Sequence, residues 1–162
     1  MSISVGTGRV VEKFATLRSR SGEVDPAELD RLWRELPTVR IEQLIGRWRG
    51  TALDTGHRVG RQLRTMNWYG KEFRSPADAK PILRHDENGD VYSDRETAQG
   101  EASLWMVEFR GEVTATMVYD GMPVFDHFKM VDENTLLGVM NGKDADLVLD
   151  RGHYFYFILE RA

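Results

Sequence analysis

From residue 47 onward the chain is a succession of short segments that contain many β-branched and aromatic residues and are separated by turn signals. Such segments are typical of β-strands. The expected strands are 47–53, 66–73, 81–84, 91–93, 102–109, 112–119, 124–131, 135–140 and 154–160. Because helices do not alternate with them, the pattern disfavours a parallel α/β sheet. About eight sequential strands predict a mainly β fold, an antiparallel up-and-down β-barrel whose closure removes exposed strand edges. An open antiparallel sheet backed by helices is the alternative.

Three glycine-containing pairs lie between the expected strands. Asn88-Gly89 and Asn141-Gly142 each predict a tight hairpin turn, because both residues tolerate a positive φ. Arg110-Gly111 predicts another such turn.

Helical spacing is confined to the first part of the chain. Apolar residues recur at three- and four-residue steps over 9–20, and Asp25-Pro26 forms a helix start before an apolar stripe that stops at Pro37. A helical turn is expected over 41–45. We therefore divide the chain into an N-terminal helical segment, 1–38, and a β-barrel domain, 39–162, as one folding unit in which the helices pack on the barrel or cap it.

Composition excludes several classes of function. The net charge of -4 provides no basic field for nucleic acid, and the absence of cysteine rules out disulfides and thiolate metal sites. No run approaches the roughly 20 apolar residues of a membrane span, and residues 1–8 contain no charged leader followed by an apolar stretch. We expect a cytoplasmic protein with no membrane span and no cofactor. A homodimer stays open.

A tryptophan bracketed by glycines opens the β region, in Gly46-Arg47-Trp48-Arg49-Gly50. The segments that follow it in order are Gly56-His57, Trp68-Tyr69-Gly70-Lys71-Glu72-Phe73, Met106-Val107-Glu108-Phe109-Arg110-Gly111, Thr116-Met117-Val118-Tyr119-Asp120, Asp126-His127-Phe128 and Leu136-Leu137-Gly138-Val139-Met140. Over 14–161 this set resembles the bacterial GXWXG family together with the domain of unknown function 4334. The resemblance implies a calycin-like (lipocalin-like) barrel with a pocket, and it implies no particular reaction.

Lipocalin-like barrels also begin with Gly-x-Trp, whose indole closes the barrel base against an arginine of the last strand. The resemblance therefore implies a structural pair of Trp48 and Arg161, which stand at the two ends of the β region. A cation-π contact of this kind contributes about 0.5 to 2 kcal/mol.

His57 and His127 are the histidines that we expect in the pocket. The four histidines form no recognisable metal signature, so no metal site is predicted. For either residue, a buried structural histidine whose ring nitrogens bond to backbone carbonyl oxygens is an equally favoured interpretation. Alternation along 124–131 places Asp126 and His127 on opposite faces, which argues against a local Asp-His pair. The sequence leaves open which face is the inner one.

The predicted function is the binding of a small hydrophobic or amphipathic molecule in the barrel cavity. Aromatic rings and flexible methionine side chains suit varied apolar shapes, and Lys71 beside Trp68 suits an amphipathic carboxylate or a carbonyl compound. The expected ligand-binding residues are His57, Trp68, Lys71, Met117, Tyr119, His127, Phe128, Met140 and Phe157.

The alternative is a cofactor-independent enzyme acting on a hydrophobic metabolite in the same cavity. His57 or His127 would be the general base and Tyr119 or Lys71 would polarise a carbonyl, in isomerase, cyclase or hydratase chemistry. Haem binding through one histidine is a third possibility.

Overall fold

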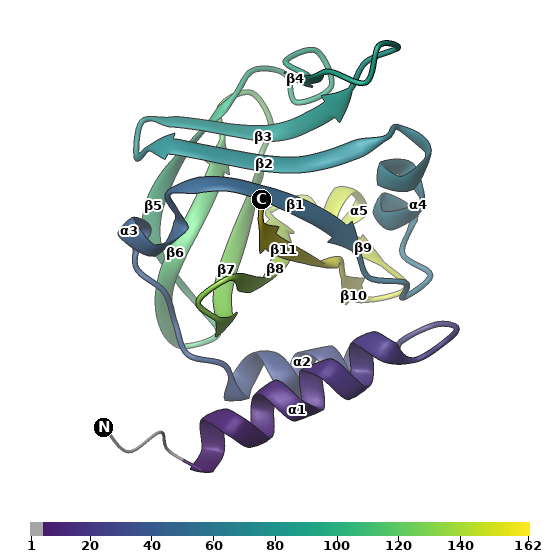
Figure 1. Ribbon diagram of the computed structural model, residues 1–162, viewed down its shortest axis with the longest axis vertical. Coiled ribbons are helices and arrows are strands. Elements are labelled where there is room, and N and C mark those ends of the chain that lie inside the picture. Colours follow the sequence, from purple (N-terminus) through teal and green to yellow (C-terminus); the bar gives the residue numbers. More distant parts are fainter. Residues whose placement is uncertain (1–4) are drawn as a thin grey trace.

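The computed structural model describes residues 5–162, and in that part of the chain nine strands form one antiparallel sheet that closes into a barrel (Figure 1). The strands of the ring follow one another in sequence, and the last pairs with the first. They are β1 (Gly46–Ala52), β2 (Trp68–Ser75), β3 (Asp78–His85), β5 (Ala102–Phe109), β6 (Glu112–Tyr119), β7 (Val124–Asp132), β8 (Thr135–Gly142) and β11 (Tyr156–Arg161). β4 (Val91–Ser93) adds to β3 outside the ring. The predicted mainly β, antiparallel up-and-down barrel is confirmed, and the open sheet is excluded.

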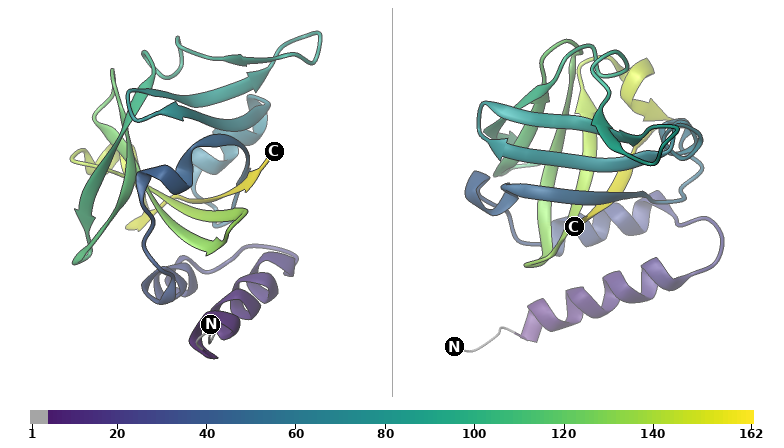
Figure 2. Two further views of the ribbon diagram at one scale, coloured as in Figure 1. Left: turned by 60° about the vertical axis from the view of Figure 1, so that its left-hand side comes forward. Right: turned by 45° about the horizontal axis from the view of Figure 1, so that its top comes forward.

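The ring is joined least firmly between β3 and β5. Only the pair Ala79 and Ala102 links these two strands, whereas β5 and β6 pair along their full lengths. The chain between them, which includes β4, runs beside β3 (Figure 2).

Two of the three predicted hairpin turns are present. Arg110 and Gly111 have φ of 53° and 80°, and Gly89 has a φ of 82° in the turn between β3 and β4. The prediction for Asn141-Gly142 is wrong, because both residues continue β8 opposite β7. A Cβ on Gly142 would lie 2.4 Å from the carbonyl oxygen of Pro123, so this glycine permits close approach of the chain rather than a turn.

The N-terminal helices pack on the outside of the barrel wall. α1 (Val5–Ser19) begins earlier than the spacing predicted, and α2 (Pro26–Glu35) is capped by Asp25, whose carboxylate accepts the backbone N–H of Ala27 at 2.9 Å. Their apolar stripes bury the outward side chains of β8 and β11. Both helices lie beside the barrel in Figure 2. Both helices lie in the predicted segment 1–38, of which residues 1–4 are outside the described part.

One buried lysine fastens these helices to the wall. Lys129 of β7 is 1% exposed and donates from Nζ to the carbonyl oxygen of Trp33 in α2 at 2.9 Å. It also pairs with Glu112 at the start of β6. The helices are therefore held by a polar anchor as well as by apolar contact.

The barrel end beside α3 (Ile41–Leu44) is closed by Trp48. The indole is fully buried and donates from Nε1 to the carbonyl oxygen of Leu44 at 2.7 Å. The guanidinium of Arg161 lies 4.2 Å from the Trp48 ring centroid and donates to the carbonyl oxygens of Ile45 and Gln43 at 3.0 and 2.9 Å. Arg161 thus ties the last strand to the chain that enters the first.

The other end is covered by elements that the strand pattern did not predict. α4 (Arg58–Thr65) and α5 (Ala145–Val148) lie on the side of the barrel opposite α3 (Figure 1). Between α5 and β11 the chain forms a small hairpin of β9 (Leu149–Asp150) and β10 (His153–Tyr154). Among the described residues, no helix has the length and apolar character needed to cross a membrane.

We expect Trp48→Ala to lower the free energy of unfolding by roughly 3 to 5 kcal/mol, because it removes a fully buried indole and its hydrogen bond. Trp105→Ala is the matched control, since that indole is 59% exposed on β5, and its loss should change the free energy by about 0.5 kcal/mol or less. Urea-induced unfolding measures both. Equal losses in the two variants would contradict a closing role for Trp48.

Candidate functional site

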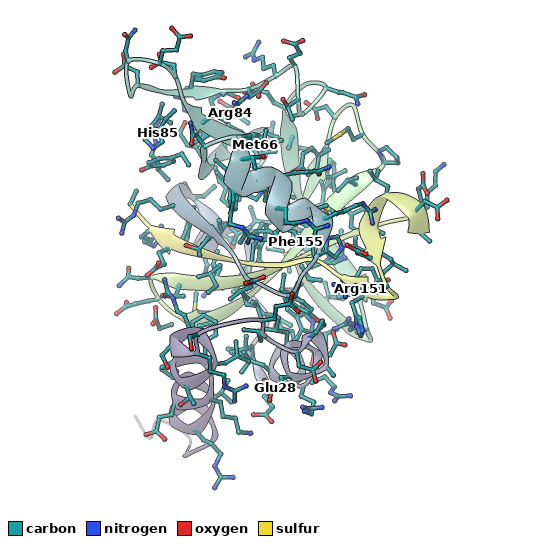
Figure 3. All side chains as sticks on the ribbon, turned by 90° about the vertical axis from the view of Figure 1, so that its right-hand side faces the viewer. Glu28, Met66, Arg84, His85, Arg151 and Phe155 are labelled. Carbon is teal, nitrogen blue, oxygen red and sulfur yellow. The ribbon has the colours of Figure 1, made fainter. Side chains whose placement is uncertain are left out.

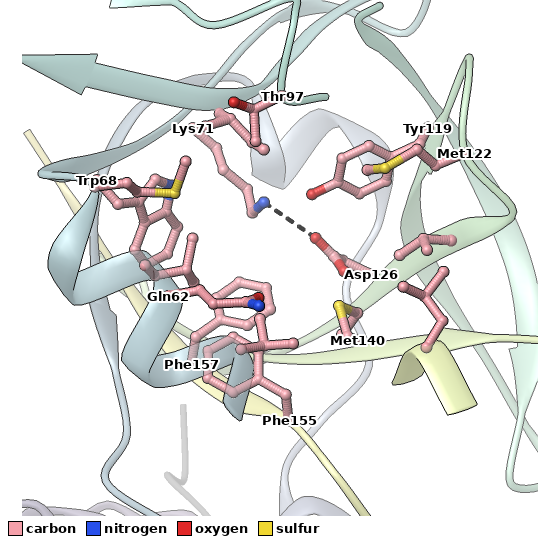
Figure 4. A pocket seen from close by; sticks show the side chains of 16 residues that line it. Gln62, Trp68, Lys71, Thr97, Tyr119, Met122, Asp126, Met140, Phe155 and Phe157 are labelled. Carbon is pink, nitrogen blue, oxygen red and sulfur yellow. Dashed lines mark ion pairs between the residues drawn. The ribbon is translucent and has the colours of Figure 1, made fainter. Parts of the chain in front are cut away.

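A cavity of about 490 Å³ opens into the barrel beneath α4 and α5 (Figure 4). Its wall is mainly apolar and comes from six strands of the ring, both covering helices and the connecting chain. The aromatic and sulfur-containing lining residues are Met66, Trp68, Tyr119, Met122, Met140, Phe155 and Phe157. Phe155 lies against α4 (Figure 3), 3.3 Å from the position that a Cβ on Gly60 would occupy.

An ion pair between Lys71 of β2 and Asp126 of β7 crosses this cavity (Figure 4). The two side chains are 4% and 2% exposed, and the Lys71 Nζ lies 3.0 Å from the Asp126 Oδ2. The same ammonium donates to the carbonyl oxygen of Pro81 at 3.0 Å. It also lies 5.6, 5.7 and 5.2 Å from the ring centroids of Trp68, Tyr119 and Phe157. These contacts stabilise the cation in an otherwise apolar space.

Two buried polar atoms of the cavity lack a hydrogen-bond partner within the described chain. They are the second carboxylate oxygen of Asp126, Oδ1, and the indole Nε1 of Trp68. One is an acceptor and the other is a donor. Buried polar atoms of this kind are rare in folded proteins and indicate a place where a ligand or water completes the hydrogen bonding.

The titration of the polar lining follows from its burial. Burial raises the pKa of Asp126, and the ion pair with Lys71 acts in the opposite direction. Burial and the nearby Asp126 charge hold the pKa of Tyr119 well above its usual range. Tyr119 is therefore a neutral phenol, able to donate as well as to accept a hydrogen bond.

A break in strand alternation puts Trp68 and Lys71 on the same side of β2. The residues are three positions apart, and regular alternation would point them to opposite faces. The register of β2 against β3 shifts on both sides of Gly70, which has a φ of 153°. A Cβ on Gly70 would lie 2.0 Å from the carbonyl oxygen of Trp48. Lys71 already shares the inner face with Phe73, two residues further along β2, so this irregularity is what directs Trp68 into the barrel.

Gly50, the second glycine around Trp48, makes room for the cavity wall. A Cβ at this position would lie 2.2 Å from Cη2 of Trp68. The glycine therefore allows the Trp68 ring to lie against β1, where it contacts Phe157 edge-on with the ring centroids 6.0 Å apart.

Five of the predicted ligand-binding residues line the cavity: Trp68, Lys71, Tyr119, Met140 and Phe157. Met117 and Phe128 are fully buried in the apolar cluster beside it and are not part of its lining. Both point into the barrel, where they fill the space between the cavity and the end closed by Trp48.

His57 lies outside this cavity. It caps the start of α4, where Nδ1 accepts the backbone N–H of Val59 at 3.1 Å and Nε2 lies 3.1 Å from the carbonyl oxygen of Val148. Burial lowers its pKa, which favours the neutral ring. The residue joins α4 to α5 and borders a separate hollow of about 390 Å³ on the outside of the barrel, next to Arg151.

His127 also lies outside the cavity, on the outer face of β7, because alternation turns it away from its neighbour Asp126. Its ring stacks on Phe109 at 4.2 Å, Nδ1 lies 2.8 Å from Oγ1 of Thr116, and the amide of Asn141 donates to Nε2 at 3.1 Å. Burial, aided by the Arg110 charge, lowers the pKa of His127 to about 4. His127 is therefore a buried, neutral histidine whose ring nitrogens both have hydrogen-bond partners.

Asp126 is the functional candidate that the sequence reasoning missed as a pocket residue. A signal was present, because Asp126 is the only charged residue on a strand face that otherwise carries Val124, Phe128 and Met130. Val59, Leu63 and Met122 were missed as well, since they belong to α4 and to a turn outside the predicted strands. Among residues 5–162, no group of three or more histidine, cysteine, aspartate or glutamate side chains is placed to hold a metal ion.

Comparisons with known proteins agree with this architecture. Residues 31–89 match the model described as GXWXG protein, and residues 100–161 match the model described as Domain of unknown function (DUF4334). A crystal structure of a protein from Thermomonospora curvata is similar, with 32% identity and a TM-score of 0.83 over 95% of this chain and 99% of that one. No curated protein matches the chain.

Acidification should destabilise the protein through His127. The pKa of this residue is about 4 in the folded state against 6.5 for an unperturbed histidine, so between these values the unfolded state takes up a proton that the folded state does not. The free energy of unfolding should therefore fall by about 3 kcal/mol as the pH drops through this window.

Chemical unfolding over this pH range measures the effect. His127→Gln should flatten the decline, whereas His153→Gln, at an exposed position, should leave it unchanged. An equally steep decline in His127→Gln would show that other groups cause the acid sensitivity.

Proposed function

This chain belongs to the family that joins a GXWXG segment to a DUF4334 domain, and we propose that its barrel binds a small hydrophobic molecule that carries a polar group. The cavity that the ion pair of Lys71 and Asp126 crosses supports this proposal most directly. Its volume of about 490 Å³ falls within the roughly 300 to 1,000 Å³ of typical ligand sites. A cytoplasmic location and a homodimer stay predictions.

The distribution of polar groups supports an amphipathic rather than a fully apolar ligand. The lining is dominated by aromatic, methionine and aliphatic side chains, which suit a hydrocarbon body. The polar atoms of Lys71, Tyr119 and Asp126 lie together in it, and Trp68 lies on the other side of the Lys71 ammonium (Figure 4). A ligand that places one polar group there satisfies buried atoms and leaves its apolar part against the wall.

Binding is testable with a neutral hydrophobic fluorophore, N-phenyl-1-naphthylamine. We expect saturable binding to the purified protein, and Met140→Trp should weaken it by about tenfold or more, because the larger side chain occupies the cavity. Val113→Trp is the matched control, since Val113 is 53% exposed on β6. If neither the native protein nor the control binds the probe with a defined stoichiometry, the proposed function is wrong.

We also propose, as the second candidate, proton-transfer catalysis in the same cavity. One observation favours it: the raised pKa of Asp126, a lining residue whose Oδ1 has no hydrogen-bond partner within the described chain, together with a neutral Tyr119 in the same lining. A carboxylate of this kind can act as a general base, while the phenol donates to a carbonyl oxygen. This assignment replaces His57 and His127, whose ring nitrogens are engaged elsewhere.

Deuterium exchange at the carbons next to the carbonyl of dodecan-2-one tests the catalytic candidate. General acid-base catalysis should accelerate exchange in D₂O by roughly a hundredfold or more over buffer. Tyr119→Phe should lose most of this acceleration while it retains the bound fluorophore. NMR of the ketone measures the rate. Exchange at the buffer rate by protein that binds the ketone would restrict the function to binding.

A further inference from the structure

We propose that the cavity selects neutral ligands with a hydroxyl group, such as long-chain or terpenoid-like alcohols, and rejects fatty-acid carboxylates. This inference rests on the proposed binding function and specifies its ligand class. It follows from the charge balance of the cavity and from the two buried atoms that lack partners.

The charge of the cavity is already balanced. Lys71 and Asp126 are the only charged side chains among the described residues that line it, and they pair with each other at 3.0 Å. A second donor site of the ammonium is taken by the Pro81 carbonyl oxygen. A ligand carboxylate would therefore add an uncompensated negative charge in an apolar space, close to the Asp126 carboxylate.

This balance revises what Lys71 alone predicts. A cation among aromatic rings favours an amphipathic carboxylate, as the sequence analysis expected. Asp126 reaches the same ammonium from the opposite wall and occupies the position that a ligand carboxylate would need. The lysine is thus a partner for the protein's own acid rather than an anchor for an anionic ligand.

The unpartnered atoms favour a hydroxyl over a carbonyl. The Asp126 Oδ1 requires a donor, and the Trp68 Nε1 requires an acceptor. A hydroxyl group both donates and accepts, so an alcohol can donate to Asp126 and accept from the neighbouring phenol of Tyr119. A ketone accepts only and leaves Oδ1 without a partner. The expected order of affinity is alcohol, then ketone, then carboxylate.

Displacement of N-phenyl-1-naphthylamine by three ligands of equal chain length tests this order at neutral pH. We expect dodecanol to bind about tenfold or more tighter than dodecanoate, with dodecan-2-one between them. If the fluorophore binds and dodecanoate displaces it as well as dodecanol does, the inference is overturned and the binding function stands. If the fluorophore itself does not bind, the proposed function fails first.

Asp126→Asn provides a reversal of specificity. The substitution keeps the shape of the side chain and leaves the Lys71 cation without a counter-charge, so dodecanoate should become the tighter ligand. Asp120→Asn removes one charge from an exposed position on the neighbouring strand end and should keep the native order. An unchanged preference for dodecanol in folded Asp126→Asn would overturn the inference.

A double variant keeps the test decisive if Asp126→Asn does not fold. Lys71→Met combined with Asp126→Leu replaces the buried pair by apolar residues, a change that folded proteins commonly tolerate. Without the carboxylate acceptor, dodecanol and dodecan-2-one should bind within about threefold of each other. A preserved advantage of dodecanol in this variant would show that Asp126 does not select the hydroxyl group.

Discussion

The ion pair between Lys71 and Asp126 is the constraint around which the barrel interior is arranged. Both side chains are almost fully buried, and each charge alone would be strongly unfavourable in that apolar space. Their mutual attraction offsets much of the desolvation cost only while the geometry of β2 and β7 holds them 3.0 Å apart. The pair also needs the Pro81 carbonyl and the surrounding aromatic rings, so the walls that carry these groups are tied to it. The barrel interior therefore contains a charged pair as well as apolar side chains, and both members of the pair line the cavity.

Two glycines that lie close to Trp48 or its backbone, Gly50 and Gly70, shape the cavity next to the closed end of the barrel. Gly50 leaves the space in which the Trp68 ring lies, and Gly70 lets β2 approach the Trp48 backbone while its register shifts. That shift turns Trp68 to the inner face that Lys71 and Phe73 share. A short motif at the start of the barrel therefore has two physical effects: Trp48 plugs one end with Arg161, and the small residues beside it shape the wall of the cavity towards the other end. The motif stabilises the fold and also positions the site.

Much of the fold could be predicted from the sequence because strand signals are local. β4, β5 and β6 begin and end at the predicted residues, and Asp25-Pro26 marked the start of α2. The failures have a common cause in tertiary contacts. α4 is rich in arginine and has a narrow apolar side, and it forms where His57 caps it and Arg58 donates to carbonyl oxygens of α5 and β9. The register shift at Gly70 depends on its contact with β1, which no local pattern encodes. Neither His57 nor His127 lines the cavity, because a motif position does not indicate in which direction a side chain points from the backbone.

The neighbours Asp126 and His127 show how one strand separates two kinds of buried polar group. Alternation directs Asp126 into the cavity and His127 towards the helices outside the wall. On the outer face of β7, both ring nitrogens of His127 have partners and the ring stacks on Phe109. Burial lowers the pKa of His127, so the ring is neutral, and its contacts stabilise the barrel wall. Inside, one oxygen of Asp126 is paired and the other has no partner within the described chain. A buried group with complete hydrogen bonding contributes to the specificity of the fold, whereas an incomplete one presents hydrogen-bonding capacity to whatever enters the cavity. The incomplete member of the pair is therefore the one on which recognition depends, although the histidine is the residue type more often associated with function.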